Sequence, residues 1–425
     1  MSQATKASPP LGNLEYGAPA SRGPRLQLFI MMVLEIAIWG AWLPKLMAYA
    51  AMLGFTGWKA TFIGSAFGVG SIVGIFFSNQ FADRNFSAER FLAFSHFVGA
   101  LALLGAAYIT SFWGFFACFL LYCLLYVPTI SVANSLAFAH LRDPAKDFGF
   151  VRMGGTIGWI VVSWPFVFLL GSAPTAHETR SIFIVAAIVS FVMAAYSLTL
   201  PHTPPRKNVH GMDRLAWIRA GKLLAIPSIL VLFIVTFIDA TVHNGYFALS
   251  DSFLTKRVGI AGNMSMIVMS LGQVAEILTM VVLGKVLLRL GWKWTMLVGI
   301  LGHVARFAIF AFFPDAKWLI VAIQLVHGIC YAFYFVTVYI FVDAFFPKDA
   351  RASAQGLFNL LILGLGQMLA FAVFPVIQQN LTVNGVVDYR TLFLIPTGMA
   401  VVGILLLALF FRPPNYGPEE STAVG

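Results

Sequence analysis

The segment MSMIVMSLGQVAEILTMVVLG (264–284) is long enough to cross a lipid bilayer as one helix, and its only strongly polar side chains are Gln273 and Glu276. About 20 mostly apolar residues span the membrane hydrocarbon as an α-helix, whereas a membrane β-barrel shows short alternating segments. Similar long apolar runs recur along the 425 residues, of which 60% are hydrophobic and only 10% charged. A soluble domain has about 25% charged residues. The sequence therefore predicts an integral membrane protein made of helices.

The apolar runs predict twelve transmembrane helices. Their expected ranges are 26–52, 58–82, 90–111, 113–140, 148–171, 180–200, 224–249, 263–288, 292–313, 316–344, 352–379 and 390–412. The longest polar connection, 201–223, divides them into two halves of six. We therefore predict an all-α membrane protein with twelve transmembrane helices in two six-helix bundles. The expected parts are a disordered tail (1–25), a bundle (26–200), a linker (201–223), a second bundle (224–412) and a second tail (413–425).

The basic residues are distributed unevenly between the two ends of the predicted helices. If the N-terminus is cytoplasmic, the loops and tails on that side carry eighteen Lys and Arg residues, against six on the opposite side. Cytoplasmic loops of membrane proteins carry such an excess, so both tails and the linker 201–223 are expected in the cytoplasm. The net charge of +10 is thus explained by topology, and we expect no nucleic acid partner. We predict a multi-pass protein of the plasma (bacterial inner) membrane.

Gln273 and Glu276 are three residues apart and lie on one helix face, which Ser270 continues. A charged side chain at the bilayer centre costs about 2.5–3.5 kcal/mol on insertion scales, so such residues are candidates for function. The alternative is a structural carboxylate that neighbouring helices satisfy. A carboxylate beside an amide at mid-depth favours contact with a polar substrate.

The stretch VRMGGTIGWI (151–160) has two different faces when it is helical. Arg152, Thr156 and Trp159 line one face, while Gly154 and Gly158 form a pair of small residues four apart on another. The first face is expected to meet a substrate and the second to pack closely on a neighbouring helix. The alternative for Arg152, which lies near the end of the apolar run, is a side chain that reaches to the membrane surface.

Three further predicted helices carry polar or aromatic stripes. The helix 316–344 carries Gln324, His327, Tyr331 and Tyr334, and the helix 26–52 carries Glu35, Trp39 and Trp42. The helix 224–249 carries Asp239, His243 and Tyr246 on one stripe, with Asn244 and Phe247 about 100° further round. Either stripe of the seventh helix can face a cavity. The alternative for His327 is a packing residue, and the alternative for Glu35 is a buried structural acid. Arg306 and Asp343 are interpreted as ion-pair or interface residues without a substrate role.

Two short basic turns lie at corresponding places in the two halves. FADRNFSAER (81–90) follows the second helix and GKVLLRLGWK (284–293) follows the eighth. Both resemble the loop motif Gly-x-x-x-Asp-Arg-x-Gly-x-basic of the major facilitator superfamily, although Asn79 stands at the glycine of the first and Leu288 at the acid of the second. The resemblance implies two six-helix repeats with a substrate site between them at mid-depth.

Six stretches, in order, resemble the nucleoside:proton symporter family within this superfamily, over about residues 26–412. They are IWGAWL (38–43), ADRNFSAER (82–90), YVPTISVAN (126–134), VRMGGTIGWI (151–160), SLGQVAEI (270–277) and RASAQG (351–356). Members of this family carry nucleosides inward together with protons. The resemblance implies a nucleoside site formed by Arg152, Thr156, Trp159, Asn244, Phe247, Gln273, Glu276, His327 and Tyr331.

Five of these positions depart from the family's residue types. Trp159 and Tyr331 stand where a Phe is usual, Asn244 replaces a glutamine, Phe247 an asparagine and His327 a tyrosine. The aromatic faces are preserved, but base selectivity can differ.

The residue chemistry suits a nucleoside. A flat base can stack on Trp159, Phe247 or Tyr331, and its polar edges suit the amide of Gln273 or the guanidinium of Arg152. Glu276 is expected to bind ribose hydroxyls, a proton or both. Glu35 and Asp239 are the alternative proton-coupling residues.

Other functions remain open at the level of sequence. The nearest alternative is a major facilitator symporter for another small polar solute such as a sugar, because fold alone does not fix the substrate. A sensor that binds nucleosides without transport is a further alternative. We do not expect an enzyme, because no HExxH, GxSxG or Cys/His grouping is present. No cofactor, metal or obligate protein partner is expected; the expected partners are a nucleoside, protons and the lipid bilayer.

Overall fold

The computed structural model describes residues 23–77, 86–142, 144–205, 221–346 and 351–413. Four predicted parts lie wholly or mostly outside these described residues: both tails, the linker, and the first half of the first loop motif, which includes Asp83 and Arg84. The described chain is almost entirely helical, as expected for a segment that must satisfy its own backbone hydrogen bonds in lipid.

The helices of the amino-terminal half agree with the six predicted ones to within a few residues. They are α1 (Gly23–Trp42), which continues through a 3₁₀ turn (Leu43–Lys45) into α2 (Leu46–Met52), α3 (Trp58–Phe77), α5 (Ala88–Tyr108), α6 (Phe112–His140), α7 (Pro144–Ser163) with the short α8 (Phe166–Leu169), α9 (Ala176–Thr179) and α10 (Ser181–Ser197).

The carboxy-terminal half contains longer and less regular helices. It begins with a 3₁₀ turn (Leu223–Ala225), followed by α12 (Pro227–Lys256), α13 (Ser265–Phe312), α14 (Lys317–Ala322), a 3₁₀ turn (Ile323–Leu325), α15 (Val326–Cys330), a π-helix (Tyr331–Val336) and α16 (Thr337–Phe345). It ends with α17 (Arg351–Asn359), a π-helix (Leu360–Leu365), α18 (Gly366–Asn380), a hairpin of β1 (Thr382–Val383) and β2 (Val386–Val387), and α19 (Tyr389–Phe410).

The long helix α13 contains two of the predicted membrane crossings. Its 48 residues are interrupted at Gly291, whose φ of 71° is a conformation that glycine adopts readily. Ten helices among the described residues are long and apolar enough to cross a membrane. The long α13 is one of these ten but contains two crossings, and the 20-residue α3 is not among the ten. With these two additions, the described helices account for all twelve predicted crossings.

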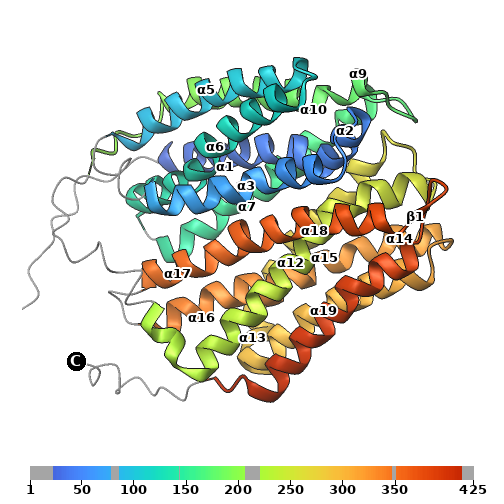
Figure 1. Ribbon diagram of the computed structural model, residues 1–425. Coiled ribbons are helices and arrows are strands. Elements are labelled where there is room, and N and C mark those ends of the chain that lie inside the picture. The colour runs from blue at the N-terminus through green and yellow to red at the C-terminus, as the bar shows by residue number, and fades with distance from the viewer. Residues whose placement is uncertain (1–22, 78–85, 143, 206–220, 347–350, 414–425) are drawn as a thin grey trace, which may run out of the picture.

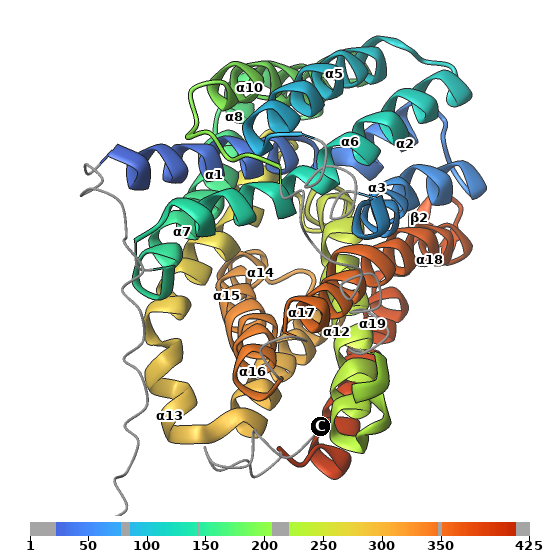
Figure 2. The ribbon, with the colours of Figure 1, turned by 90° about the vertical axis from the view of Figure 1, so that its left-hand side faces the viewer.

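The helices pack as two bundles that meet along a shared face. In Figure 1 the blue-to-green helices of the amino-terminal half lie above the yellow-to-red helices of the carboxy-terminal half. Figure 2 shows the same division from the side. Helix α3 packs along α18, and α7 along α13, across the boundary between the halves. The predicted fold class is therefore confirmed.

The predicted close packing of Gly154 and Gly158 is also confirmed. A Cβ atom at Gly158 would lie 2.1 Å from the backbone oxygen of Val33 on α1, and one at Gly154 would lie 2.6 Å from that of Phe29. Any larger side chain at either position would push α1 away from α7. These glycines thus fix the helix whose other face carries Arg152 and Thr156.

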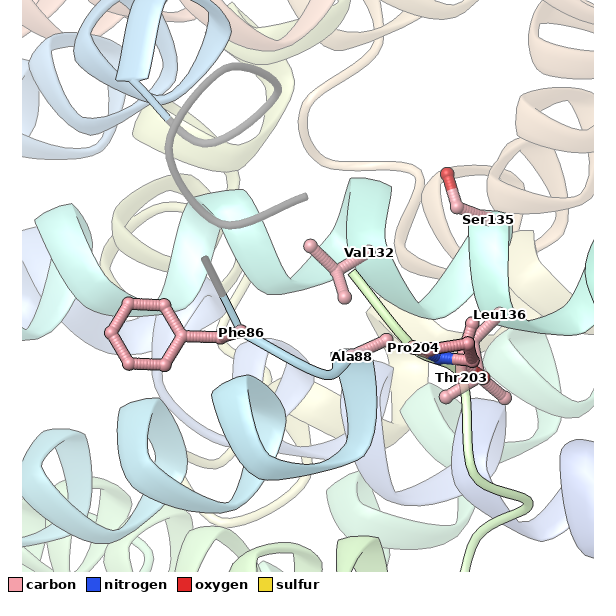
Figure 3. Close-up of a pocket in the computed structure, with 7 residues that line it drawn as sticks. All are labelled: Phe86, Ala88, Val132, Ser135, Leu136, Thr203 and Pro204. Atoms are coloured by element: carbon pink, nitrogen blue, oxygen red, sulfur yellow. The ribbon is translucent and has the colours of Figure 1, made fainter. Parts of the chain in front are cut away.

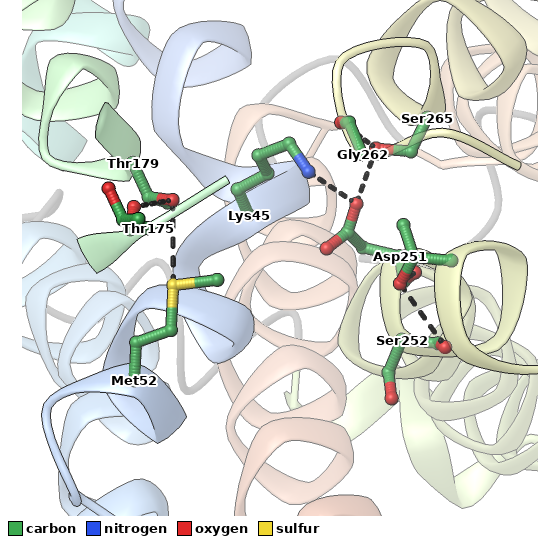
Figure 4. A network of polar contacts seen from close by, with 9 residues as sticks. Lys45, Met52, Thr175, Thr179, Asp251, Ser252, Gly262 and Ser265 are labelled. Carbon is green, nitrogen blue, oxygen red and sulfur yellow. Dashed lines mark hydrogen bonds and ion pairs between the residues drawn. The ribbon is translucent and has the colours of Figure 1, made fainter. Parts of the chain in front are cut away.

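A buried ion pair joins the halves at the end of the molecule where β1 and β2 lie, which we call the hairpin side. Lys45 Nζ lies 2.8 Å from Oδ1 of Asp251, and Ser265 Oγ donates to the same oxygen at 2.5 Å. Figure 4 shows the lysine of the amino-terminal half pointing at the aspartate of α12. Close by, the Gly262 amide donates to Ser172 O at 2.7 Å. These contacts close the two halves together on the hairpin side.

Candidate functional site

A hydrogen bond at mid-depth joins the two polar stripes that the sequence predicts on α7 and α13. Thr156 Oγ1 donates to Oε1 of Glu276 at 3.2 Å, and both side chains are buried. Arg152, one turn before Thr156, interacts electrostatically with Glu276 and with Tyr331 of the other half. Just beyond the end of α7, Trp164 Nε1 donates to Ser270 Oγ on α13 at 3.3 Å. The two stripes therefore face each other across the boundary between the halves.

Aromatic rings from four helices, α1, α3, α7 and α12, gather next to this contact. The rings of Trp159 and Phe247 have centroids 5.5 Å apart, and Trp39 meets the edge of Trp159 at 5.8 Å. Trp39 also stacks on Phe67 at 4.7 Å. The buried indole N–H of Trp39 has no hydrogen-bond partner among the described residues. The site thus combines flat apolar faces with a free donor, a combination that suits a planar polar molecule.

Gln273 lies beside His327 because two glycines let α13 and α15 approach closely. Nε2 of Gln273 lies 3.3 Å from Nε2 of His327. A Cβ at Gly328 would lie 2.4 Å from the backbone of Ala275, and one at Gly272 would lie 2.9 Å from Cβ of His327. The glycine after His327 therefore places the imidazole against the amide.

Arg306, interpreted from the sequence as an ion-pair or interface residue, contacts a candidate site residue. Its Nη1 lies 2.7 Å from Nδ1 of His327, and its guanidinium lies 4.2 Å over the ring of Tyr246. Arg306 is completely buried on the second part of α13. Arg306 is therefore connected to Gln273 through one intervening side chain, that of His327.

Only half of the stripe predicted in the tenth helix reaches the site. His327 and Tyr331 do, but Gln324 accepts a hydrogen bond from Tyr246 at 2.8 Å, and the Tyr334 hydroxyl lies 3.1 Å from that of Thr236. The reason is the changing helix geometry, from a 3₁₀ turn at 323–325 to a π-helix at 331–336. The prediction assumed a constant 3.6 residues per turn, which these segments do not have.

Both predicted stripes of the seventh helix, α12, touch the site. The ring of His243 stacks on His327 at 4.9 Å and lies 5.9 Å from Tyr331, while Phe247 meets His327 edge-on at 5.8 Å. The amide of Asn244 instead donates to the backbone oxygens of Ala240 at 2.8 Å and Ile362 at 3.3 Å. Its nitrogen is therefore engaged by the protein itself.

The other two candidate carboxylates are each held within one half. Glu35 lies 2.9 Å from His96 Nε2 and accepts from Thr129 at 2.6 Å, whereas Asp239 lies 2.9 Å from His303 Nδ1. Unlike Glu276, neither makes a described polar contact across the boundary. Among the described residues, no group of three or more His, Cys, Asp or Glu side chains is arranged to hold a metal ion.

A small pocket lies elsewhere, between the start of α5, the last third of α6 and the segment that follows α10. Phe86, Val132 and Thr203 are among its lining residues (Figure 3). None of the candidate site residues lines it, so we assign it no role in substrate binding.

Lys45, Asp251 and the contact of Arg306 with His327 were not predicted from the sequence. Lys45, Asp251 and Arg306 are ionisable residues in apolar surroundings, which is itself a signal of function in a membrane helix. Lys45 lies within the predicted helix 26–52, and Asp251 lies just beyond the predicted end of the seventh helix at residue 249. That Lys45 and Asp251 pair with each other was not visible in the sequence.

Comparisons with known proteins agree with this arrangement. The family described as Nucleoside H⁺ symporter matches residues 23–416. YegT of Escherichia coli (strain K12) is 32% identical over 418 residues, which cover 94% of this chain and 95% of YegT. The nucleoside permease NupG of the same organism is 29% identical, covering 91% of this chain and 96% of NupG. A crystal structure of the nucleoside transporter NupG superposes with a TM-score of 0.80 at 27% identity, covering 92% of this chain and 99% of that one, and confirms the predicted architecture. The chain belongs to the nucleoside H⁺ symporter family.

Proposed function

We propose that this protein carries nucleosides across the membrane together with protons, by alternating access between its two halves. The observation that carries the proposal is the hydrogen bond between Thr156 and Glu276 at 3.2 Å, which joins the halves next to the rings of Trp159 and Phe247. A solute bound at this boundary is released to one side or the other as the halves rock about it.

The site residues have complementary roles in this proposal. The base stacks between aromatic rings that include Trp159 and Phe247, and the amide of Gln273 contacts its polar edge. Arg152 and Glu276 are assigned to the base edge and the ribose hydroxyls respectively. Thr156, Asn244, His327 and Tyr331 complete the wall of the site. The name of NupG, a nucleoside permease, supports this substrate class.

Glu276 is the proposed proton-coupling residue. Glu35 and Asp239 already have histidine partners inside their own halves, at 2.9 Å in each case. Glu276 instead depends on a hydroxyl from the opposite half and lies within the electrostatic reach of Arg152. When the halves separate on one side, Glu276 loses that hydroxyl and meets water, where it can exchange a proton.

The protein crosses the membrane many times. We propose further that it lies in the plasma (inner) membrane with both tails and the linker 201–223 in the cytoplasm, and that 26–200 and 224–412 move as separate bundles. A cysteine introduced at His210 should then resist an impermeant thiol reagent applied to sealed cells. One at Val386, which is 73% exposed in the hairpin and outside the candidate membrane spans, should react. The opposite pattern would reverse the topology.

Coupled proton movement in proteoliposomes tests the function. An inward uridine gradient should acidify the lumen, reported by an enclosed pH-sensitive dye, and a sugar gradient should not. Glu276→Gln should abolish uridine-driven acidification while it keeps some exchange of internal for external uridine. Glu35→Gln removes the alternative coupling carboxylate, which is also buried but has its partners within one half, and it should keep uridine-driven acidification. If Glu276→Gln still concentrates uridine with normal pH dependence, another residue couples transport to protons. If sugar gradients acidify the lumen and uridine gradients do not, the substrate is a sugar and not a nucleoside.

A further inference from the structure

Arg306, His327 and Gln273 form a continuous chain of polar contacts that ends at the proposed substrate site. Arg306 Nη1 lies 2.7 Å from His327 Nδ1, and His327 Nε2 lies 3.3 Å from Gln273 Nε2. The three side chains belong to residues that are 0%, 2% and 5% exposed, respectively. Because all three residues are buried, the direction of each hydrogen bond is set by the side chains themselves.

The guanidinium fixes the protonation of the histidine. Arginine is permanently charged and can only donate hydrogen bonds. His327 must therefore accept at Nδ1, which means that this nitrogen carries no hydrogen. A neutral imidazole has one N–H, so in His327 the hydrogen is on Nε2, and Nε2 is a donor.

The histidine in turn fixes the orientation of the glutamine. The amide nitrogen of Gln273 is also a donor, and two donors facing each other at 3.3 Å cannot form a hydrogen bond. The amide oxygen Oε1 of Gln273 is buried and has no partner among the described residues. Turning the amide by half a rotation, which leaves the shape of the side chain unchanged, lets Oε1 accept from His327. Both N–H groups of Gln273 then take the place of Oε1 and point away from His327.

We propose that Arg306 is a positioning residue for specificity, which acts through His327 to make Gln273 present hydrogen-bond donors to the base. The site then selects nucleosides whose base carries a carbonyl oxygen at the contacted edge over those with an amino group there. Uridine should be preferred to cytidine, and inosine to adenosine. This inference rests on the proposed function, in which Gln273 contacts the base.

The expected selectivity follows from what a mismatch would leave buried. An amino group placed against the Gln273 amide would put two donors together without acceptors. Leaving a buried donor unsatisfied weakens binding by about 5- to 150-fold. The same reasoning applies to a pyrimidine and to a purine, because both comparisons make the same exchange. A carbonyl oxygen becomes NH₂, and the neighbouring ring nitrogen changes from an N–H donor to an acceptor.

Binding of these four nucleosides to the purified protein, measured by calorimetry, tests the proposal. The wild type should bind uridine more tightly than cytidine, and inosine more tightly than adenosine, each by about 5- to 150-fold. Arg306→Met keeps most of the length but cannot donate, so His327 and Gln273 can both turn and the ratios should fall towards one. Arg306→Lys keeps a permanent donor and should keep the preference. If Arg306 has only a structural role, Arg306→Met should weaken the binding of all four nucleosides by the same factor.

A second variant keeps the test decisive if Arg306→Met does not fold. Gln273→Glu has the same shape, but an ionised carboxylate only accepts, so the preference should reverse towards cytidine and adenosine. Equal affinities in the wild type, or an unchanged preference in Gln273→Glu, would overturn the inference and leave the proposed function intact. Absence of binding by all four nucleosides would overturn both.

Discussion

Replacing Lys45 by methionine should open the hairpin side of the protein. Lys45 and Asp251 are 1% and 6% exposed, and they come from opposite halves. The methionine fills the same volume but leaves Asp251 with only the hydroxyl of Ser265 as a described side-chain partner. Removing one member of a buried ion pair costs about 3–5 kcal/mol, because the remaining charge stays buried and uncompensated.

That cost applies only while the halves are closed on the hairpin side. In the open arrangement Asp251 meets water, and most of the penalty disappears. The equilibrium between the two arrangements should therefore shift towards the open one by up to about 3–5 kcal/mol, or about two to three and a half orders of magnitude. The double variant Lys45→Met/Asp251→Leu has no buried charge left and should return towards the closed arrangement.

Spin labels at Phe168 and Val386 can report this shift by double electron–electron resonance. Both positions are well exposed, at 90% and 73%, and they belong to opposite halves on the hairpin side. In a background without the native cysteines, Lys45→Met should move the distance distribution to longer values, and the double variant should reverse the change. If the single variant gives the same distribution as the parent, the ion pair does not hold the halves together and the reasoning fails.

Three further predictions concern binding, packing and pH. Arg152→Ala should weaken uridine binding by about 1–3 kcal/mol in calorimetry, because it leaves buried polar partners unsatisfied; wild-type affinity would place the site elsewhere. Gly158→Leu should lower the melting temperature, since its Cβ would lie 2.1 Å from a backbone oxygen of α1 and overpacking costs about 1–3 kcal/mol; an unchanged melting temperature would contradict the close packing. Hydrogen bonds from Arg257 hold the pKa of Asp315 below its ordinary value. The ion pair is therefore fully formed at any pH above the ordinary pKa of aspartate, and it is lost only as the pH falls through the lowered pKa. Asp315→Asn should therefore leave the pH profile of transport between about pH 5 and 8 unchanged, and a shifted profile would mean that this exposed pair takes part in coupling.

Helix positions and the packing of α1 on α7 could be predicted from the sequence because they depend on local patterns. Hydropathy over about 20 residues locates a membrane helix regardless of its neighbours. Gly154 and Gly158, four apart, mark a face for close approach in the same local way. The polar residues at 273 and 276 could be chosen as site candidates because charges in lipid are costly.

The remaining features depend on which distant segments meet. Lys45 pairs with a residue 206 positions away, and Arg306 reaches the site only because α13 folds back at Gly291. The π-helix at 331–336 has no signature in the hydropathy pattern, so Tyr334 was expected on the wrong face. The hairpin at 382–387 was missed although Asn384 and Gly385, both at positive φ, form a typical two-residue turn.

The two carboxylate–histidine pairs have a mechanical consequence. Glu35 on α1 binds His96 on α5, and Asp239 on α12 binds His303 on the second part of α13, so in each half the first membrane helix is braced against the third. Breaking either brace would leave a polar group unpartnered in a bundle surrounded by lipid, a cost of several kcal/mol. The same first helices also carry the ion pair that closes the hairpin side. In each half, the first and third membrane helices should therefore move as one rigid unit. A displacement that begins at the bound solute should reach the hairpin side with little bending of single helices.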